Sequence, residues 1–139
     1  FSEKAEAIVS ESTGVARNTR GPGQQTIPGT GRGGVRVPDL RLRGAGGSFR
    51  LRGSIVEVKA SATGKSFGDL SARSRDQIRD AVTYARRLQE RANLVKDPVV
   101  KETLLSAHVE VFSDLKAPTS GEFADLMEEG ILRWKAIPR

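Results

Sequence analysis

The chain has 139 residues, a formal net charge of +6 and a sequence pI near 10.2, with 37% hydrophobic and 29% charged residues. This composition supports one folded domain over residues 1–139 and argues against a fully disordered chain. The sequence has no Cys and one His, His108, which excludes disulfides, thiolate–zinc sites and His-rich metal sites. No apolar run approaches the ~18 residues of a membrane span. Because the chain starts at Phe1, we expect a C-terminal fragment of a larger protein.

The first half predicts a short helix, a long loop and a β-hairpin. A narrow apolar stripe indicates a helix over residues 2–12. Residues 13–34 are rich in Gly and Pro and predict an irregular loop. Alternation over Val35–Arg43 predicts a strand whose phase slips at Pro38, and residues 48–60 predict the second strand of the hairpin.

The strongest helix signal follows, over residues 75–94. Apolar residues recur there at three-to-four spacing, and Ser74 with Gln77 has the pattern of a capping box. A third strand is predicted over residues 104–112, with a helix after Pro98 as an alternative for its first part.

The last third predicts a short helix and a strand. Thr119 and Glu122 have the pattern of a second capping box, Gly130 ends the helix, and a strand covers residues 131–137. The predicted order is α-β-β-α-β-α-β, which is an α/β fold with no internal repeat and no second domain.

Three residues of the hairpin form a candidate catalytic set. Glu57 and Lys59 lie two apart on a strand and therefore share a face, and Asp39 on the neighbouring strand could lie beside Glu57. The face carrying Val56 and Val58 is then expected to receive the helix 75–94. Two carboxylates suit Mg²⁺, and the lysine could orient an attacking water or stabilise developing charge.

Pro38-Asp39 and, after a gap of 17 residues, Glu57-Val58-Lys59 resemble the PD-(D/E)xK signature of restriction-endonuclease-like nucleases. The resemblance implies an α+β sandwich with a mixed sheet of about four strands flanked by helices. It also implies an endonuclease in which Asp39 and Glu57 bind Mg²⁺ (or Mn²⁺) and Lys59 assists the nucleophilic water.

The family often adds two further site residues. One is an acid of the first helix, for which Glu6 and Glu11 are candidates here and Glu11, nearer the loop, is preferred. The other is a Gln on the helix after the motif, a position that Gln77 fits. A purely structural role of Gln77 in its capping box is the alternative.

The segments IPGTGRGGVRVPDLRLR, IVEVKAS and SRDQIRDAVTYAR are similar to C-terminal nuclease domains of bacterial polymorphic toxins, of the contact-dependent inhibition and Rhs types. This resemblance implies a secreted toxin delivered into the cytoplasm of a target bacterium. It implies as partner a cognate, acidic immunity protein that covers the site in the producer.

The arginines of the first half predict contacts with nucleic acid. Between residues 17 and 52 there are eight Arg, no Lys and one acid, whereas residues 97–139 have five basic and eight acidic residues. Guanidinium groups bind phosphate in a bidentate way, and the expected phosphate contacts are Arg32, Arg36, Arg41 and Arg43. Aromatic residues make up only 5% of the chain, which argues against recognition of single strands by base stacking. Arginine-rich loops suit contacts with the backbone of a duplex, so DNA is favoured over RNA.

Several alternatives stay open at this stage. A tRNA- or RNA-cleaving toxin of the same fold, a repair-type nuclease and a non-catalytic basic nucleic-acid-binding module all fit the charge distribution. Glu57 and Lys59 could also form an ordinary salt-bridged strand face. We expect His108 to be a structural residue of its strand.

Overall fold

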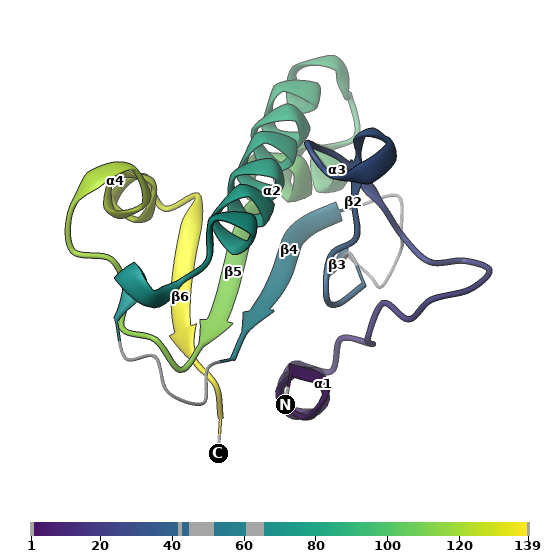
Figure 1. Cartoon of the computed structure of the whole chain (residues 1–139). Helices are drawn as coiled ribbons and strands as arrows, with labels where there is room; N and C mark the ends of the chain where they lie inside the picture. The colour runs from purple at the N-terminus through teal and green to yellow at the C-terminus, as the bar shows by residue number, and fades with distance from the viewer. Residues whose placement is uncertain (1, 42, 45–51, 61–65, 139) are drawn as a thin grey trace.

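The fold is a mixed α/β arrangement, which confirms the predicted class (Figure 1). The computed structural model describes residues 2–41, 43–44, 52–60 and 66–138. Its main sheet has the strand order β3-β4-β5-β6 and comprises β3 (Arg43–Gly44), β4 (Arg52–Lys59), β5 (His108–Ser113) and β6 (Leu132–Ala136). The first pair is antiparallel and the other two pairs are parallel.

The two central strands of the main sheet, β4 and β5, are largely buried on both faces, because helices pack against both. α2 (Ala72–Arg91) covers the face that includes Ile55, and α1 (Ser2–Thr13) packs on the face that includes Val56 and Val58. The prediction that the long helix covers Val56 and Val58 is therefore wrong. A strand buried on both sides offers apolar residues to each, so its sequence does not indicate which helix covers which face.

The long helix begins one turn earlier than predicted. Ser71 is its N-cap, and its side chain accepts a hydrogen bond from the backbone N–H of Ser74 at 3.1 Å. The predicted capping box of Ser74 and Gln77 is thus wrong, which leaves the Gln77 side chain available for other contacts. The helix continues into η4 (Ala92–Leu94), and its apolar stripe is buried as expected.

The region after α2 resolves the sequence's ambiguity in favour of a helix. α3 (Pro98–Leu105) precedes β5, and the Asp97 side chain accepts from the N–H groups of Val99 and Val100. α4 (Gly121–Glu129) ends at Gly130, whose φ of 85° needs a residue without a Cβ. Its N-cap is Ser120 without a side-chain cap bond, so the predicted capping box of Thr119 and Glu122 is wrong as well.

The predicted hairpin forms only in part. β2 (Val35–Arg36) pairs with β1 (Ile27–Pro28) in a separate two-stranded sheet, with η1 (Arg32–Gly34) between them. β3 pairs with β4, and the turn that joins them lies outside the described residues. Pro38, which lacks an N–H donor, lies between β2 and β3 and interrupts the single strand that was predicted there.

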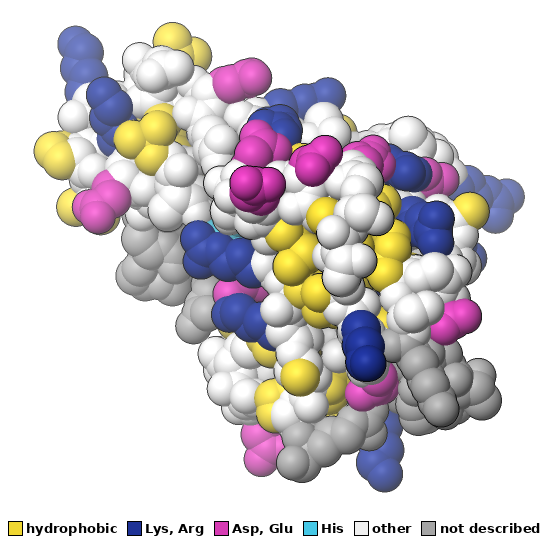
Figure 2. Space-filling view, turned by 90° about the vertical axis from the view of Figure 1, so that its left-hand side faces the viewer, with side chains coloured by type: hydrophobic (Ala, Val, Ile, Leu, Met, Phe, Trp, Pro, Cys, Tyr) yellow, Lys and Arg dark blue, Asp and Glu magenta, His cyan; other side chains and the backbone are white. Residues whose placement is uncertain are grey.

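Charge is distributed unevenly over the surface. The side of the molecule that carries α4 shows a group of acidic side chains (Figure 2), consistent with the exposed acids of that helix, namely Glu122, Asp125, Glu128 and Glu129. None of the described helices combines the length and the apolar character that a bilayer crossing requires.

Candidate active site

A pocket of about 350 Å³ opens where α1, the segment after Pro38, the end of β4 and the start of α2 meet. Together with Leu115 after β5, segments from five parts of the chain thus contribute to one site. The pocket is lined by Glu6, Asp39, Val58, Lys59, Ala60, Asp69, Leu70, Ser71, Ser74, Gln77 and Leu115. It contains charged and hydroxyl-bearing side chains and little apolar surface.

The three residues of the predicted motif lie close together, with Asp39 and Lys59 lining the pocket and Glu57 buried beside Lys59. The Lys59 Nζ lies 3.7 Å from the Glu57 Oε2 and 4.0 Å from the Asp39 Oδ2. The side chains of Lys59 and Glu57 are 10% and 4% exposed, so water screens this ion pair poorly. One lysine therefore faces two carboxylates in a largely dry setting.

Of these three groups, Glu57 has the environment that least favours its charged form. Burial raises the pKa of its carboxyl well above the ordinary range, and the neighbouring Asp39 carboxyl, which hydrogen-bonds to it, raises it further. The ammonium of Lys59 opposes this effect without cancelling it. Two carboxyl groups thus share one ammonium, and the charged form of Glu57 is disfavoured.

Gln77 completes the environment of the lysine. The Lys59 Nζ donates a hydrogen bond to the Gln77 Oε1, which fixes the direction of the ammonium. The contact forms because α2 covers the Glu57 and Lys59 face and because Ser71, rather than Ser74, caps the helix. The predicted site residue Gln77 does contact Lys59, although the prediction of which face of β4 the helix covers is wrong.

Asp39 is positioned by backbone contacts on both of its sides. Its Oδ2 accepts a hydrogen bond from the Val58 N–H at 2.7 Å, and its carbonyl accepts from the Asn18 N–H at 3.1 Å. The buried Asn18 side chain also donates to the carbonyls of Pro38 and Gln25. Asn18 is a positioning residue that the sequence analysis missed, and its only signal was a lone Asn in a Gly-rich loop.

The first helix contributes Glu6 to the pocket, and Glu11 is exposed elsewhere. Burial and the nearby Asp39 raise the pKa of Glu6, and the Arg17 Nη2 lies 3.8 Å from its carboxylate. The preference for Glu11 is not supported by this placement. Both glutamates flank the apolar stripe of α1, so only the orientation of the helix distinguishes them.

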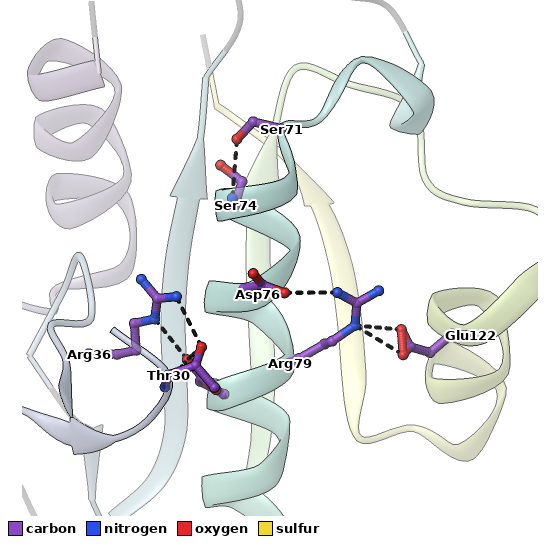
Figure 3. Close-up of polar contacts among 8 residues, drawn as sticks. Thr30, Arg36, Ser71, Ser74, Asp76, Arg79 and Glu122 are labelled. Carbon is purple, nitrogen blue, oxygen red and sulfur yellow. Dashed lines mark hydrogen bonds and ion pairs between the residues drawn. The ribbon is translucent and has the colours of Figure 1, made fainter. Parts of the chain in front are cut away.

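The arginines expected to contact phosphate fall into different settings. The Arg36 Nε donates to the Asp80 Oδ2 at 2.7 Å and its Nη2 donates to the Thr30 Oγ1, so this guanidinium is engaged on α2 (Figure 3). The Arg41 Nη1 donates to the Gly23 carbonyl. Arg32 is exposed, and the side chain of Arg43 lies outside the described residues. Arg36 therefore holds the small sheet to α2 rather than presenting a free cation.

The site offers the carboxylates of Asp39 and Glu57 as oxygen donors. In the ranges that the structure describes, no three Asp, Glu or His side chains come together as a metal-binding group, so other ligands would have to complete the shell of a bound cation. Mg²⁺ commonly takes one or two carboxylates and completes its shell with water and substrate phosphate. A cation bound beside Glu57 would favour the charged form of its carboxyl, which burial and Asp39 disfavour.

Comparisons with protein families, with curated proteins and with solved structures found no match for this chain.

Proposed function

We propose that the protein is a Mg²⁺-dependent phosphodiester hydrolase that acts on nucleic acid. The observation that supports the proposal most directly is the meeting of Asp39, Lys59 and Gln77 at one pocket, with Glu57 buried directly beside Lys59. A pure phosphate-binding module gains nothing from two adjacent carboxylates, one of them buried, in its basic half. A structural salt bridge needs only one acid for one lysine, whereas two carboxyl groups share Lys59 here.

The residues of the predicted motif and their direct neighbours each have a role in the proposed reaction. Asp39 and Glu57 would hold the cation, which supplies charge neutralisation of the phosphate and a lower pKa of bound water. The Val58 N–H fixes the Asp39 carboxylate, and Gln77 directs the ammonium of Lys59. Lys59 would donate to the attacking water or to a phosphate oxygen as negative charge develops. Glu6 adds a further acceptor at the pocket.

The overall charge supports a nucleic-acid substrate. A net charge of +6 and a pI near 10.2 favour association with a polyanion. Exposed arginines such as Arg20, Arg32 and Arg73 are available for backbone contacts, which position a substrate without reading its sequence. DNA remains the first choice of substrate, with tRNA as the second.

The resemblance of the motifs to those of known nucleases and toxins also supports a proposal about the biological role of the protein. We propose a restriction-endonuclease-like nuclease that serves as the toxin domain of a bacterial polymorphic toxin and acts in the cytoplasm of a target cell. A cognate immunity protein with an acidic surface would neutralise it in the producer, since such a surface complements the arginine-rich half.

The test is a cleavage assay on plasmid DNA and on total tRNA, with Mg²⁺ and with EDTA. We expect metal-dependent cleavage that is lost in Lys59→Ala and retained in Lys96→Ala, a matched change of an exposed lysine outside the pocket. Circular dichroism of both variants controls for folding. If neither substrate is cleaved while salt-sensitive binding persists, the protein is a non-catalytic binding module.

A further inference from the structure

A second pocket lies next to the candidate active site. It has a volume of about 330 Å³ and lies between the segment of η3 (Phe67–Asp69) and the segment that leads into α4. Its lining residues are Ser66, Phe67, Gly68, Lys116, Ala117, Pro118, Thr119 and Ser120. This volume is within the range of small-molecule sites in proteins.

The two pockets share their walls. Gly68 lines the second pocket and the next residue, Asp69, lines the first. Leu115 lines the first pocket and Lys116 lines the second. Because consecutive Cα atoms are about 3.8 Å apart, the linings of the two pockets adjoin at these two pairs of neighbouring residues. A ligand that occupies both would extend over neighbouring chemical groups, such as the parts of one nucleotide.

The two pockets differ in chemistry. The first presents the carboxylates, Lys59 and Gln77, which suit a phosphodiester and its cation. The second is lined mainly by apolar surface from Phe67, Ala117 and Pro118, with the hydroxyls of Ser66, Thr119 and Ser120 at hand. A nucleobase has the matching character, since its faces are apolar and its edges carry hydrogen-bonding groups.

Two aromatic side chains pack against Phe67, which forms part of the apolar wall of the second pocket. The Phe67 ring packs against Phe123 at a centroid distance of 5.0 Å and against the Trp134 ring at 5.6 Å. The Trp134 Nε1 donates to the Leu115 carbonyl at 2.9 Å, which ties both walls to β6. An aromatic cluster of this kind makes the pocket a preformed feature, because its side chains are already ordered by one another.

We propose that this second pocket binds the base of a nucleotide adjacent to the scissile phosphate, so that the substrate is single-stranded or contains an unpaired base. The inference rests on the proposed function for the class of substrate. A base inside a duplex cannot enter the pocket without leaving the stack, which costs free energy. Lys116 lies at the same pocket and can contact the phosphate that follows the base.

The experiment measures binding in EDTA, so that it does not depend on cleavage. Trp134 is the only Trp of the chain and contacts both pocket walls, so its fluorescence reports occupancy. The probe is a single-stranded oligonucleotide, compared with its duplex and with a series carrying one abasic position each. We expect saturable quenching by the single strand, at least about tenfold weaker binding of the duplex, and about tenfold weaker binding when one particular base is missing.

A variant that fills the pocket sharpens the test. Ala117→Leu is expected to weaken binding of the intact strand about tenfold and to leave binding of the abasic strand unaffected. The substitution and the abasic position remove the same contact between the base and the pocket, so their effects do not add. Ala16→Leu, at an exposed position that lines neither pocket, should change neither. Equal binding of intact and abasic strands by the wild-type protein would overturn the proposal, even if Ala117→Leu failed to fold.

The outcomes separate this inference from the proposed function. Base-dependent quenching without any metal-dependent cleavage would refute the hydrolase and leave the base pocket standing. Cleavage of duplex and single strand at equal rates, with quenching that ignores abasic positions, would refute the base pocket and leave the hydrolase standing.

Discussion

Two buried glutamates on neighbouring strands have opposite electrostatic environments. Glu57 on β4 and Glu110 on β5 are 3% and 6% exposed. The register pairs Val56 with Glu110, so the two carboxylates point to opposite faces of the sheet. The pKa of Glu57 is raised well above its ordinary range by burial and by Asp39, whereas hydrogen bonding from His108 and Lys135 lowers the pKa of Glu110 to about 2.

The difference lies in how each carboxylate is compensated. The Glu110 Oε1 lies 2.7 Å from the Lys135 Nζ and 3.5 Å from the His108 Nε2. Glu57 shares the single ammonium of Lys59 with a second carboxylate. The comparison indicates that Glu110 stabilises the fold, as expected for His108 and its strand. Glu57 is held in an environment that costs stability and is suited to binding a cation.

The largest expected effect is on cleavage. Glu57→Gln should lower the rate by about 10³-fold or more, because the amide cannot ligate a hard cation as a carboxylate does. Glu110→Gln, the same chemical change on the opposite face, should leave the rate unchanged. Both variants are assayed on the substrate that the wild-type protein cleaves in Mg²⁺. Equal losses in the two variants would show that the contrast between the two glutamates has no functional meaning.

The next effect is on acid stability. A carboxyl whose folded pKa of about 2 lies below its ordinary 4.5 stabilises the fold above about pH 4.5, and this contribution is lost as the pH falls toward 2. Glu110→Gln should therefore lower the free energy of unfolding at pH 7 by about 1–2 kcal/mol, discounted for partial solvent screening.

Denaturant titrations between pH 7 and pH 2 measure this contribution. The difference between the wild type and Glu110→Gln should shrink steadily below pH 5, because the wild-type carboxyl becomes protonated. A variant that is as stable as the wild type at pH 7 would contradict the role assigned to the pair of Glu110 and Lys135.

A third prediction concerns the two glutamates of α1. Glu6 lines the pocket and its pKa is raised by burial and by Asp39, whereas Glu11 is exposed. Glu6→Gln should reduce cleavage about tenfold, because it removes a negative charge at the pocket while keeping an acceptor oxygen. Glu11→Gln is the matched control and should have no effect. The reverse result would restore the sequence-based preference for Glu11.

The smallest expected effect has the opposite sign. Because the folded pKa of Glu57 lies above its ordinary value, the native state binds more protons than the unfolded state, and stability falls as the pH rises through that interval. Glu57→Gln removes this cost, so in EDTA the variant should be more stable than the wild type at pH 8, with a smaller difference at pH 5. Thermal unfolding measures both. A variant less stable at pH 8 would contradict this interpretation.

The local patterns of the sequence predicted much of the chain correctly. The apolar stripe identified α2, and Gly14 and Gly130 have the positive φ expected of helix ends. The order of helices and strands agrees apart from the helix α3, the unpredicted short strand β1 and the division of the first predicted strand into β2 and β3. The spacing of Glu57 and Lys59 placed both on one face of β4. These features depend on backbone periodicity and on glycine's freedom at positive φ, which are local properties.

The details of the candidate site depended on contacts between distant segments. The capping assignments failed because Ser, Thr and Asp recur near both helix starts, and only the packed fold selects Ser71 and Ser120. The role of Arg36 also changed, because Asp80 on α2 is 44 residues away in the sequence and engages its guanidinium. A side chain's partner over such a separation is not encoded in local pattern.

The sequence by itself determined that Asp39, Glu57 and Lys59 could meet, because a strand alternates its side chains and a motif of this spacing needs only a neighbouring segment. Only the tertiary structure decided that α2 covers the Glu57 face, that Glu6 rather than Glu11 turns to the pocket, and that Arg36 is engaged elsewhere. The physical reason is that β4 is apolar on both faces and α1 is amphipathic over a narrow stripe. Several packings satisfy those local patterns equally, and the sum of the long-range contacts selects one.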